Sequence, residues 1–298
     1  MTVDVEDWFQ VENFKQCIPF SSWSSRELRV EKNTYRLLDL FDSCEKRGAI
    51  ENVPPAKIHA TFFVLGWIAE RLPHLVREIH ARGHEVASHG YLHNLCYQQS
   101  FDDLTKDLSD NKKLLEDIIG AEIYGYRAPS FSITDDILKI IEDCGYLYDS
   151  SFNSFGMTGR YGRIDFLQGI HQRIVKISGK FYEMPISNVK LGKFILPWGG
   201  GGYFRLIPFR LFKRGVQFEL KKTGMYLFYI HPWEIDSEQP RVNEAPAFYR
   251  FRHYVNLRNS YIKLLMFFET FSRCSFATCH QYLEKIGTTE YFPESPRR

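Results

Sequence analysis

Short apolar runs alternate with longer amphipathic stretches over the first half of the chain. Five runs have the length and the β-branched or aromatic content of strands: TVDVEDWF at the start, HATFFVLG at 59–66, HEVASH at 84–89, AEIYGYRAPS and YLYDSS. The stretches between them repeat apolar residues at helical spacing and carry capping signals: 33–48, 72–83, 100–120 (Ser100 with Asp103) and 134–145 (Thr134). Strands separated by helices pair in parallel through crossovers, so the pattern predicts a barrel or a doubly wound sheet.

The pattern is less regular in the second half of the chain. Residues 152–207 predict loops with short strands, KKTGMYLFYIHPWE (221–234) predicts a strongly apolar strand, and 246–271 predict helix. No internal repeat, low-complexity tract or linker interrupts the sequence. We therefore expect one catalytic domain over residues 1–298, with 236–298 a helical C-terminal extension packed on it.

Composition and charge exclude several classes of protein. The chain is 44% hydrophobic and 25% charged, which is ordinary for a globular protein. Lys plus Arg (38) nearly balances Asp plus Glu (36), so nothing points to nucleic acid or an anionic membrane. No run reaches the roughly 18 apolar residues of a membrane span, and the acidic start does not resemble a signal peptide. The six scattered cysteines contain no CxxC pair, so we expect a reduced, cytoplasmic protein.

Three carboxylates stand together where the first strand ends. Asp4, Glu6 and Asp7 lie among apolar and β-branched residues, which favours a buried strand over a solvated helix. Carboxylates at the end of a buried strand are costly unless they are paired or bind a metal. They are therefore candidate functional residues.

Two histidines four residues apart follow another predicted strand. If a helical turn begins after HEVAS, His89 and His93 project to one side and can share a cation. Sites in α/β barrels and open α/β sheets form at the carboxyl ends of strands, where the opening acids also lie. Two histidines and one carboxylate, with an open position for water, are typical of catalytic zinc.

Two further strand ends carry polar residues. Arg127, in GYRAPS, can hold a carboxylate ionised through a bidentate pair. His231, in YIHPWEID, is a candidate general acid, and Asp149, in LYDSS, could orient and charge it.

Four consecutive glycines occupy positions 199–202. No phosphate-loop or dinucleotide-binding context accompanies them, so we expect a rim loop beside the pocket. Trp198 and Tyr203 flank the run and could either stack on a sugar ring or pack structurally.

Together these motifs resemble a known family. ATFFVLG, GHEVASHGYLH and RAPS, after an acidic strand, are similar in order to the polysaccharide deacetylase family (carbohydrate esterase family 4) over most of residues 1–235. TVDVEDWF with PWGGGGYFRLIP, HPWE and FRHYVNL resembles the branch associated with bacterial exopolysaccharide and surface-glycan biosynthesis. The resemblance implies a distorted (β/α) barrel and metal-dependent removal of N-acetyl groups from amino sugars.

The resemblance also implies roles for individual residues. Asp4 matches the general base, His89 and His93 the metal-binding pair, Arg127 the arginine that steadies the base, and His231 the general acid. The commonest family pattern has two adjacent Asp, whereas Val5 follows Asp4 here. Because Asp4 and Glu6 face the same way on a strand, we assign Glu6 as the carboxylate ligand, with Asp7 as the alternative if the strand kinks after Val5.

The remaining assignments concern the substrate and the metal. Ser130 replaces the Tyr of many relatives, but only its backbone N–H is needed for an oxyanion site, and Trp233 of HPWE is assigned to substrate binding with Trp198 and Tyr203. We expect Zn²⁺, with Co²⁺, Ni²⁺, Mn²⁺ or Fe²⁺ as alternatives, and an N-acetylated glycan or its nucleotide- or lipid-linked precursor as substrate. The alternatives are a catalytically silent glycan-binding module and a deformylase of a lipid-linked amino sugar.

Overall fold

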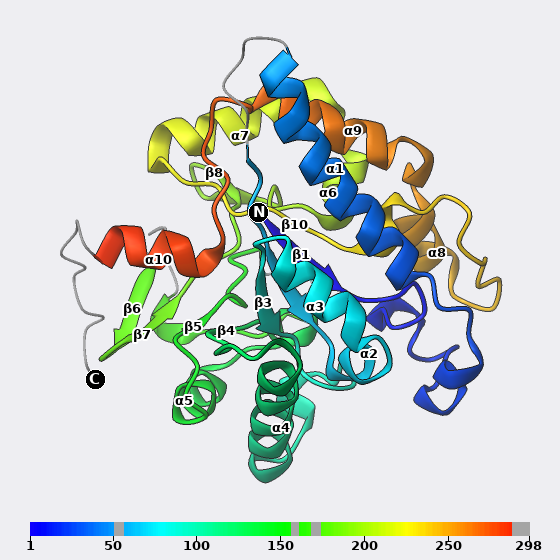
Figure 1. The fold of residues 1–298 in the computed structure, drawn as a ribbon, viewed down its shortest axis with the longest axis vertical. Coiled ribbons are helices and arrows are strands. Elements are labelled where there is room, and N and C mark those ends of the chain that lie inside the picture. Colours follow the sequence, from blue (N-terminus) through cyan, green and yellow to red (C-terminus); the bar gives the residue numbers. More distant parts are fainter. Residues whose placement is uncertain (51–56, 156–160, 168–173, 288–298) are drawn as a thin grey trace.

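The computed structural model of the protein describes residues 1–50, 57–155, 161–167 and 174–287. Its centre is an eight-stranded sheet in the order β10-β1-β2-β3-β4-β5-β7-β6 (Figure 1). Every pairing in this sheet is parallel except β6 with β7. The strands are β1 (Thr2–Val5), β2 (Thr61–Val64), β3 (Glu85–Ser88), β4 (Gly125–Tyr126), β5 (Tyr148–Asp149), β6 (Val175–Ser178), β7 (Phe181–Glu183) and β10 (Tyr229–Ile230).

Helices surround the curled sheet and make it a distorted (β/α) barrel, as predicted (Figure 1). They are α1 (Val30–Ile50), α2 (Gly66–Arg71), α3 (Pro73–Ala81), α4 (Phe101–Ile119), α5 (Asp135–Asp143), α6 (Gly201–Leu206), α7 (Phe209–Thr223), α8 (Ala247–Tyr254), α9 (Leu257–Thr270) and α10 (Cys279–Gly287). A separate hairpin pairs β8 (Val189–Leu191) with β9 (Phe194–Leu196). None of the helices in the described ranges has the length and apolar character needed to cross a membrane.

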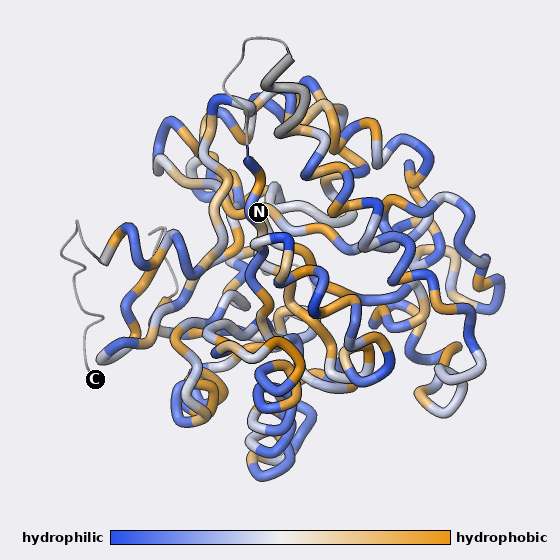
Figure 2. The backbone as a smooth tube through the Cα atoms, in the orientation of Figure 1, coloured by the Kyte–Doolittle hydropathy of each residue, from blue (hydrophilic) through white to orange (hydrophobic). Residues whose placement is uncertain are grey.

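Helices α4 and α5 begin where the sequence predicts, whereas α1 begins at Val30, ahead of the predicted start at residue 33, and α2 is not predicted. Ser100 Oγ accepts a hydrogen bond from the N–H of Asp103 at 3.1 Å, and Thr134 Oγ1 accepts from Ile137 at 3.4 Å, which confirms both capping signals. Apolar residues on the inner faces of α3, α4 and α5 pack against strands β3 and β5. The hydropathy along the backbone follows this division between inner and outer faces (Figure 2).

The second half differs from the sequence prediction in three places, one of which is the helix predicted over 246–271, divided into α8 and α9 at Asn256 (φ +54°). The predicted strand at 221–234 is strand only at Tyr229–Ile230, because its first three residues complete α7 and Gly224 ends that helix with φ +70°. The last two glycines of the 199–202 run begin α6 instead of extending a loop. Gly200, at φ +137°, forms a bridge with Tyr229, so the glycine run lies directly along the edge strand β10.

Candidate active site

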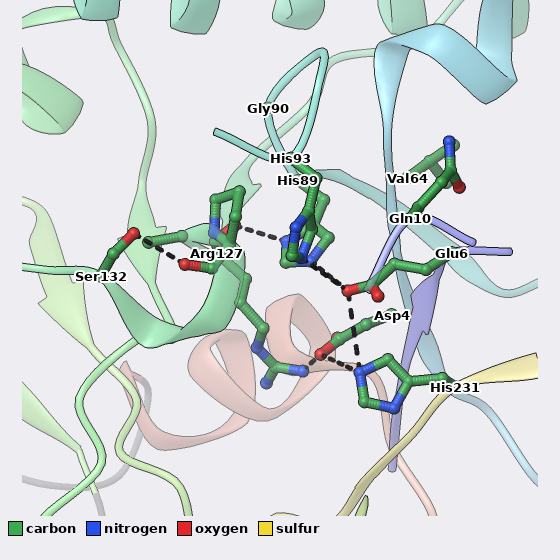
Figure 3. A network of polar contacts seen from close by, with 12 residues as sticks. Asp4, Glu6, Gln10, Val64, His89, Gly90, His93, Arg127, Ser132 and His231 are labelled. Carbon is green, nitrogen blue, oxygen red and sulfur yellow. Dashed lines mark hydrogen bonds and ion pairs between the residues drawn. The ribbon is translucent and has the colours of Figure 1, made fainter. Parts of the chain in front are cut away.

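The candidate site gathers residues from the carboxyl ends of β10, β1, β3 and β4, four of the five strands at one side of the sheet (Figure 3). Asp4 lies on β1 and Glu6 follows it, while His89, Arg127 and His231 each come directly after β3, β4 and β10. Parallel strands end at one edge of a sheet, so residues far apart in sequence meet there. The structure therefore brings together the residues assigned as base, ligands, arginine and acid.

Glu6, His89 and His93 form a buried cluster whose ligand atoms all lie within 4.8 Å of one another. Glu6 Oε1 is 3.1 Å from His89 Nε2 and 3.0 Å from His93 Nε2. Burial raises the pKa of Glu6, but His93, His231 and the hydrogen bond to His89 outweigh it and hold the pKa well below its usual range.

The two histidines converge by a route that the sequence does not predict. No helical turn follows β3; the chain instead bends at Gly90 (φ +71°) and again at His93 (φ +55°). Asn111, on α4, fixes this loop by donating to Ser88 Oγ at 2.8 Å and to the Gly90 carbonyl at 3.0 Å. The left-handed backbone of His93 is costly for a residue with a side chain, so the surrounding contacts must hold it.

The donor set fits a divalent cation. The Nδ1–H of His89 donates to the carbonyl of Arg127 at 2.7 Å, which makes Nε2, 3.1 Å from Glu6 Oε1, the nitrogen that can bind a cation. Two imidazole nitrogens and one carboxylate oxygen thus meet in a buried space, which is a ligand set typical of catalytic zinc.

Asp7, the alternative ligand, performs a different task. Its carboxylate accepts hydrogen bonds from the backbone N–H groups of Trp8 (2.8 Å), Arg29 (2.7 Å) and Val30 (2.9 Å), the last of which begins α1. Burial raises the pKa of Asp7 to about 6, and these N–H donors oppose that rise. The carboxylate therefore caps α1, and it is Glu6 that lies beside the histidines.

Asp4 and Arg127 form a completely buried ion pair. Arg127 Nη1 is 2.6 Å from Asp4 Oδ1 and also donates to Thr2 Oγ1 at 2.8 Å. The other guanidinium nitrogens donate to the carbonyl and hydroxyl oxygens of Ser150, each at 2.9 Å. The guanidinium lies 4.1 Å from the centroid of the Phe63 ring. These contacts fix the Asp4 carboxylate and leave Oδ2 facing the site.

His231 approaches the cluster from the opposite flank. Its Nε2 is 3.9 Å from Asp4 Oδ2 and 3.7 Å from Glu6 Oε1. Its Nδ1–H donates to Glu234 Oε1 at 2.7 Å. Burial lowers the pKa of His231, but the carboxylates of Glu6, Glu234 and Asp4 outweigh it and raise the pKa to about 9.

Glu234 is in turn held by Arg205, from α6. Arg205 Nε is 2.7 Å from Glu234 Oε2, and both side chains are buried. The other nitrogens of Arg205 donate to the carbonyls of His253 (2.7 Å), Val255 (2.9 Å) and Arg252 (3.1 Å). His231 is thus tied through one carboxylate and one guanidinium to the turn between α8 and α9.

This arrangement differs from the sequence-based pairing of His231 with Asp149. Asp149 accepts from the N–H and hydroxyl of Ser151 at 2.9 and 2.7 Å and lies beside Glu183. Burial and the Asp149 carboxylate hold the pKa of Glu183 well above its usual range. Glu234 has the role predicted for Asp149, because its carboxylate orients His231. Its spacing of three residues from His231 in HPWE is the sequence signal that could have identified it.

A pocket opens beside the cluster, and two of the four predicted substrate residues line it. Ser130 and Trp233 lie in its wall with Gly201, Gly202 and Tyr229. Backbone angles of φ +52° at Ser130 and +59° at Phe131 bend the chain sharply at this wall.

The other two predicted substrate residues pack against neighbouring aromatic rings away from the pocket, with Trp198 buried and Tyr203 partly exposed. Trp198 donates from Nε1 to the Phe212 carbonyl at 2.8 Å and stacks on that ring, while Tyr203 packs edge-on against Phe155. Neither is among the residues that line the pocket. Of the two roles open for them, packing is the one that the geometry favours.

Two segments of the chain match known protein families. Residues 51–148 match the family described as polysaccharide deacetylase, and residues 150–284 match a domain of unknown function, DUF3473. The chain is 32% identical over 90 residues to a peptidoglycan-N-acetylglucosamine deacetylase of Bacillus cereus, and 32% identical over 92 residues to a chitooligosaccharide deacetylase of Sinorhizobium fredii. Each match covers 30% of this chain and 42% of the relative, so the chain spans less than half the length of either.

A solved structure supports the fold over the whole length. A polysaccharide deacetylase structure from Mycobacterium smegmatis aligns with 100% of this chain and 92% of its own at a TM-score of 0.61, with 18% identity. The segment matched by the second family model supplies β10, which pairs with β1 in the same sheet as the segment matched by the first. The match to the polysaccharide deacetylase family therefore covers residues 51–148, and the likeness of fold extends over the whole chain.

Proposed function

We propose that this protein is a metal-dependent hydrolase that removes N-acetyl groups from an amino sugar of a bacterial surface polysaccharide or of its nucleotide- or lipid-linked precursor. One observation carries the proposal: Glu6, His89 and His93 converge in a buried cluster between the Asp4–Arg127 pair and His231. The named activities of the two relatives support the same class of reaction.

The residues divide the work of amide hydrolysis between two flanks. Glu6, His89 and His93 would hold a divalent ion, best Zn²⁺ for this ligand set, which would polarise the acetyl carbonyl and lower the pKa of a water molecule. Asp4 Oδ2 is the oxygen free to take the proton of the attacking water, because Oδ1 is bound by Arg127 at 2.6 Å.

His231 completes the reaction on the other side. An amine leaves poorly as an anion, so the nitrogen must receive a proton as the C–N bond breaks. The Nε2 of His231 faces Asp4 and Glu6, while its Nδ1–H is fixed on Glu234. Protonated His231 can therefore donate from Nε2 and remain oriented by Glu234.

The test has two measurements: the amount of zinc bound by the protein and its variants, and the identity of the acid released from the substrate. Purified wild type is expected to bind about one Zn²⁺ per chain after exposure to the metal, as a single three-ligand site requires. His93→Ala is expected to lose it. His74→Ala is the matched control, since His74 is exposed on α3 and pairs with Glu31.

N-acetylated and N-formylated chito-oligosaccharides should then be assayed separately for acetate and formate release. Acetate release that disappears in His93→Ala and persists in His74→Ala supports the proposal. Formate release alone would replace it by a deformylase. Absence of bound metal in the wild type would overturn the metal-dependent hydrolase and favour a silent glycan-binding module.

A further inference from the structure

Helix α8 presents two large aromatic side chains to solvent. Phe248 is 63% exposed and Phe251 is 57% exposed, and their spacing of three residues places both rings on one side of the helix. Pro246 and Ala247, directly before them, are exposed as well. Isolated exposed hydrophobic residues are ordinary, but adjacent ones at the tip of an element indicate a contact surface.

Positive charge surrounds these rings, although the chain as a whole is nearly neutral. Residues 237–258 contain four arginines (241, 250, 252 and 258) and two glutamates (238 and 244). The guanidinium of Arg241 lies 4.2 Å from the centroid of the Tyr254 ring, and Arg250 donates to the Asn243 carbonyl at 3.2 Å. Arg252 lies over the ring of Phe248 at 5.7 Å. Exposed phenylalanines with arginines around them are the composition of an interfacial, membrane-surface segment.

The location of α8 connects this surface to the candidate active site. The helix packs on the short helix Glu12–Phe14, which follows β1, and Arg252 also lines the pocket beside Glu6 and His231. Its C-terminal carbonyls bind Arg205, which holds Glu234. Helix α8 therefore lies at the carboxyl-end side of the barrel (Figure 1), and the pocket that Arg252 lines lies next to it.

We propose that α8 docks this protein on an anionic lipid bilayer, with Phe248 and Phe251 inserted at the headgroup level and the arginines on lipid phosphates. Docking at this position places the pocket at the bilayer surface. The inference extends the proposed function, because it favours a lipid-linked glycan over a free nucleotide-linked sugar as substrate.

The test measures binding of the full chain to lipid vesicles by sedimentation. Wild type is expected to bind vesicles of phosphatidylcholine with phosphatidylglycerol, and to bind more weakly in high salt or without the anionic lipid. The double variant Phe248→Ser/Phe251→Ser should bind at least about tenfold more weakly in both salt conditions. Arg250→Ser should weaken binding about fivefold, and only to the anionic vesicles.

Phe101→Ser is the matched control, because Phe101 is 58% exposed at the start of α4. It should bind vesicles as wild type does. The proposal is overturned if wild type does not sediment with anionic vesicles, or if the double variant binds equally well. Self-association that the double variant abolishes, without vesicle binding, would assign the surface to contact between two copies. The assay needs neither metal nor turnover, so its failure leaves the proposed hydrolase intact.

Discussion

Glu234→Gln tests whether the buried carboxylate next to His231 serves the reaction. Glu234 is fully buried and binds His231 Nδ1 through one oxygen and Arg205 Nε through the other, both at 2.7 Å. The amide of Gln has nearly the same shape but no charge, and it has only one oxygen to accept a hydrogen bond. Either Arg205 or His231 must therefore face an N–H group in the variant.

The structure sets the size of both expected effects. Breaking a buried ion pair by removing one charge costs about 3–5 kcal/mol. Arg205 keeps three carbonyl partners, so we expect the lower end, about 3 kcal/mol in the free energy of unfolding. Loss of general acid catalysis costs about 10²–10⁴-fold in rate. Since Glu234→Gln leaves the imidazole in place, we expect a fall of about 10²-fold in kcat, with KM little changed.

The assay follows kcat, KM, zinc content and urea unfolding in Glu234→Gln beside Glu183→Gln. Glu183 is also fully buried, but its pKa is held well above the usual range by burial and by Asp149, so the same substitution there replaces a neutral group. We expect Glu183→Gln to change stability by less than about 1 kcal/mol and to leave kcat within a few-fold of wild type. Full kcat in a destabilised Glu234→Gln protein would show that Glu234 is purely structural and refute its positioning role.

Two further substitutions test the local geometry. Asp7→Ala should lower the free energy of unfolding by about 2–4 kcal/mol, because three backbone N–H groups lose their acceptor. Its zinc content should stay at the wild-type level. Loss of zinc would show that Asp7 is a metal ligand after all. Gly200→Ala should destabilise the protein by several kcal/mol in urea unfolding. The new Cβ would lie 1.9 Å from the Tyr229 carbonyl oxygen, and residue 200 has φ +137°, which strains any residue with a side chain. Wild-type stability would contradict the described contact with β10.

The fold could be predicted in the first half because local signals there are mutually consistent. HATFFVLG and HEVASH contain β2 and β3, and the Ser100 and Thr134 caps begin α4 and α5. In the second half tertiary contacts override the local pattern. An apolar run predicts a long strand over 221–234, but β10 has two residues, because α7 extends to Thr223. Nothing in the glycine run itself indicates that it lies along β10.

The candidate site shows the same division between local and long-range information. Strand alternation correctly places the Asp4 and Glu6 side chains on the same face of the chain, where both lie near His231. Residues two apart on a strand face the same way regardless of which strand pairs with it. The partner of His231 depends on contacts across the barrel, and the sequence suggested Asp149 where the geometry gives Glu234. The sequence pattern predicts that a helical turn brings His89 and His93 together. In the structure, left-handed backbone at Gly90 and His93 does so instead.

Sheet register explains why these particular positions meet. Val5 pairs with Val64, Val64 with Ser88, and Ser88 with Tyr126, so these residues form one level across the sheet. Glu6, His89 and Arg127 are the next residues on three of those strands. On the other side of β1, Val3 pairs with Ile230, so the register continued by one residue sets Asp4 beside His231.

A shift of β1 by one residue would turn Asp4 and Glu6 away from the site and bring Val5 and Asp7 to it. Asp7 resists that shift, because its carboxylate is bound to the start of α1 by three N–H donors. The three opening carboxylates thus have separate tasks that depend on one another. Asp7 ties the end of β1 to the start of α1. The pairing of β1 with β2 and β10 places the proposed base Asp4 and the proposed ligand Glu6 on the face of the strand where the histidines converge.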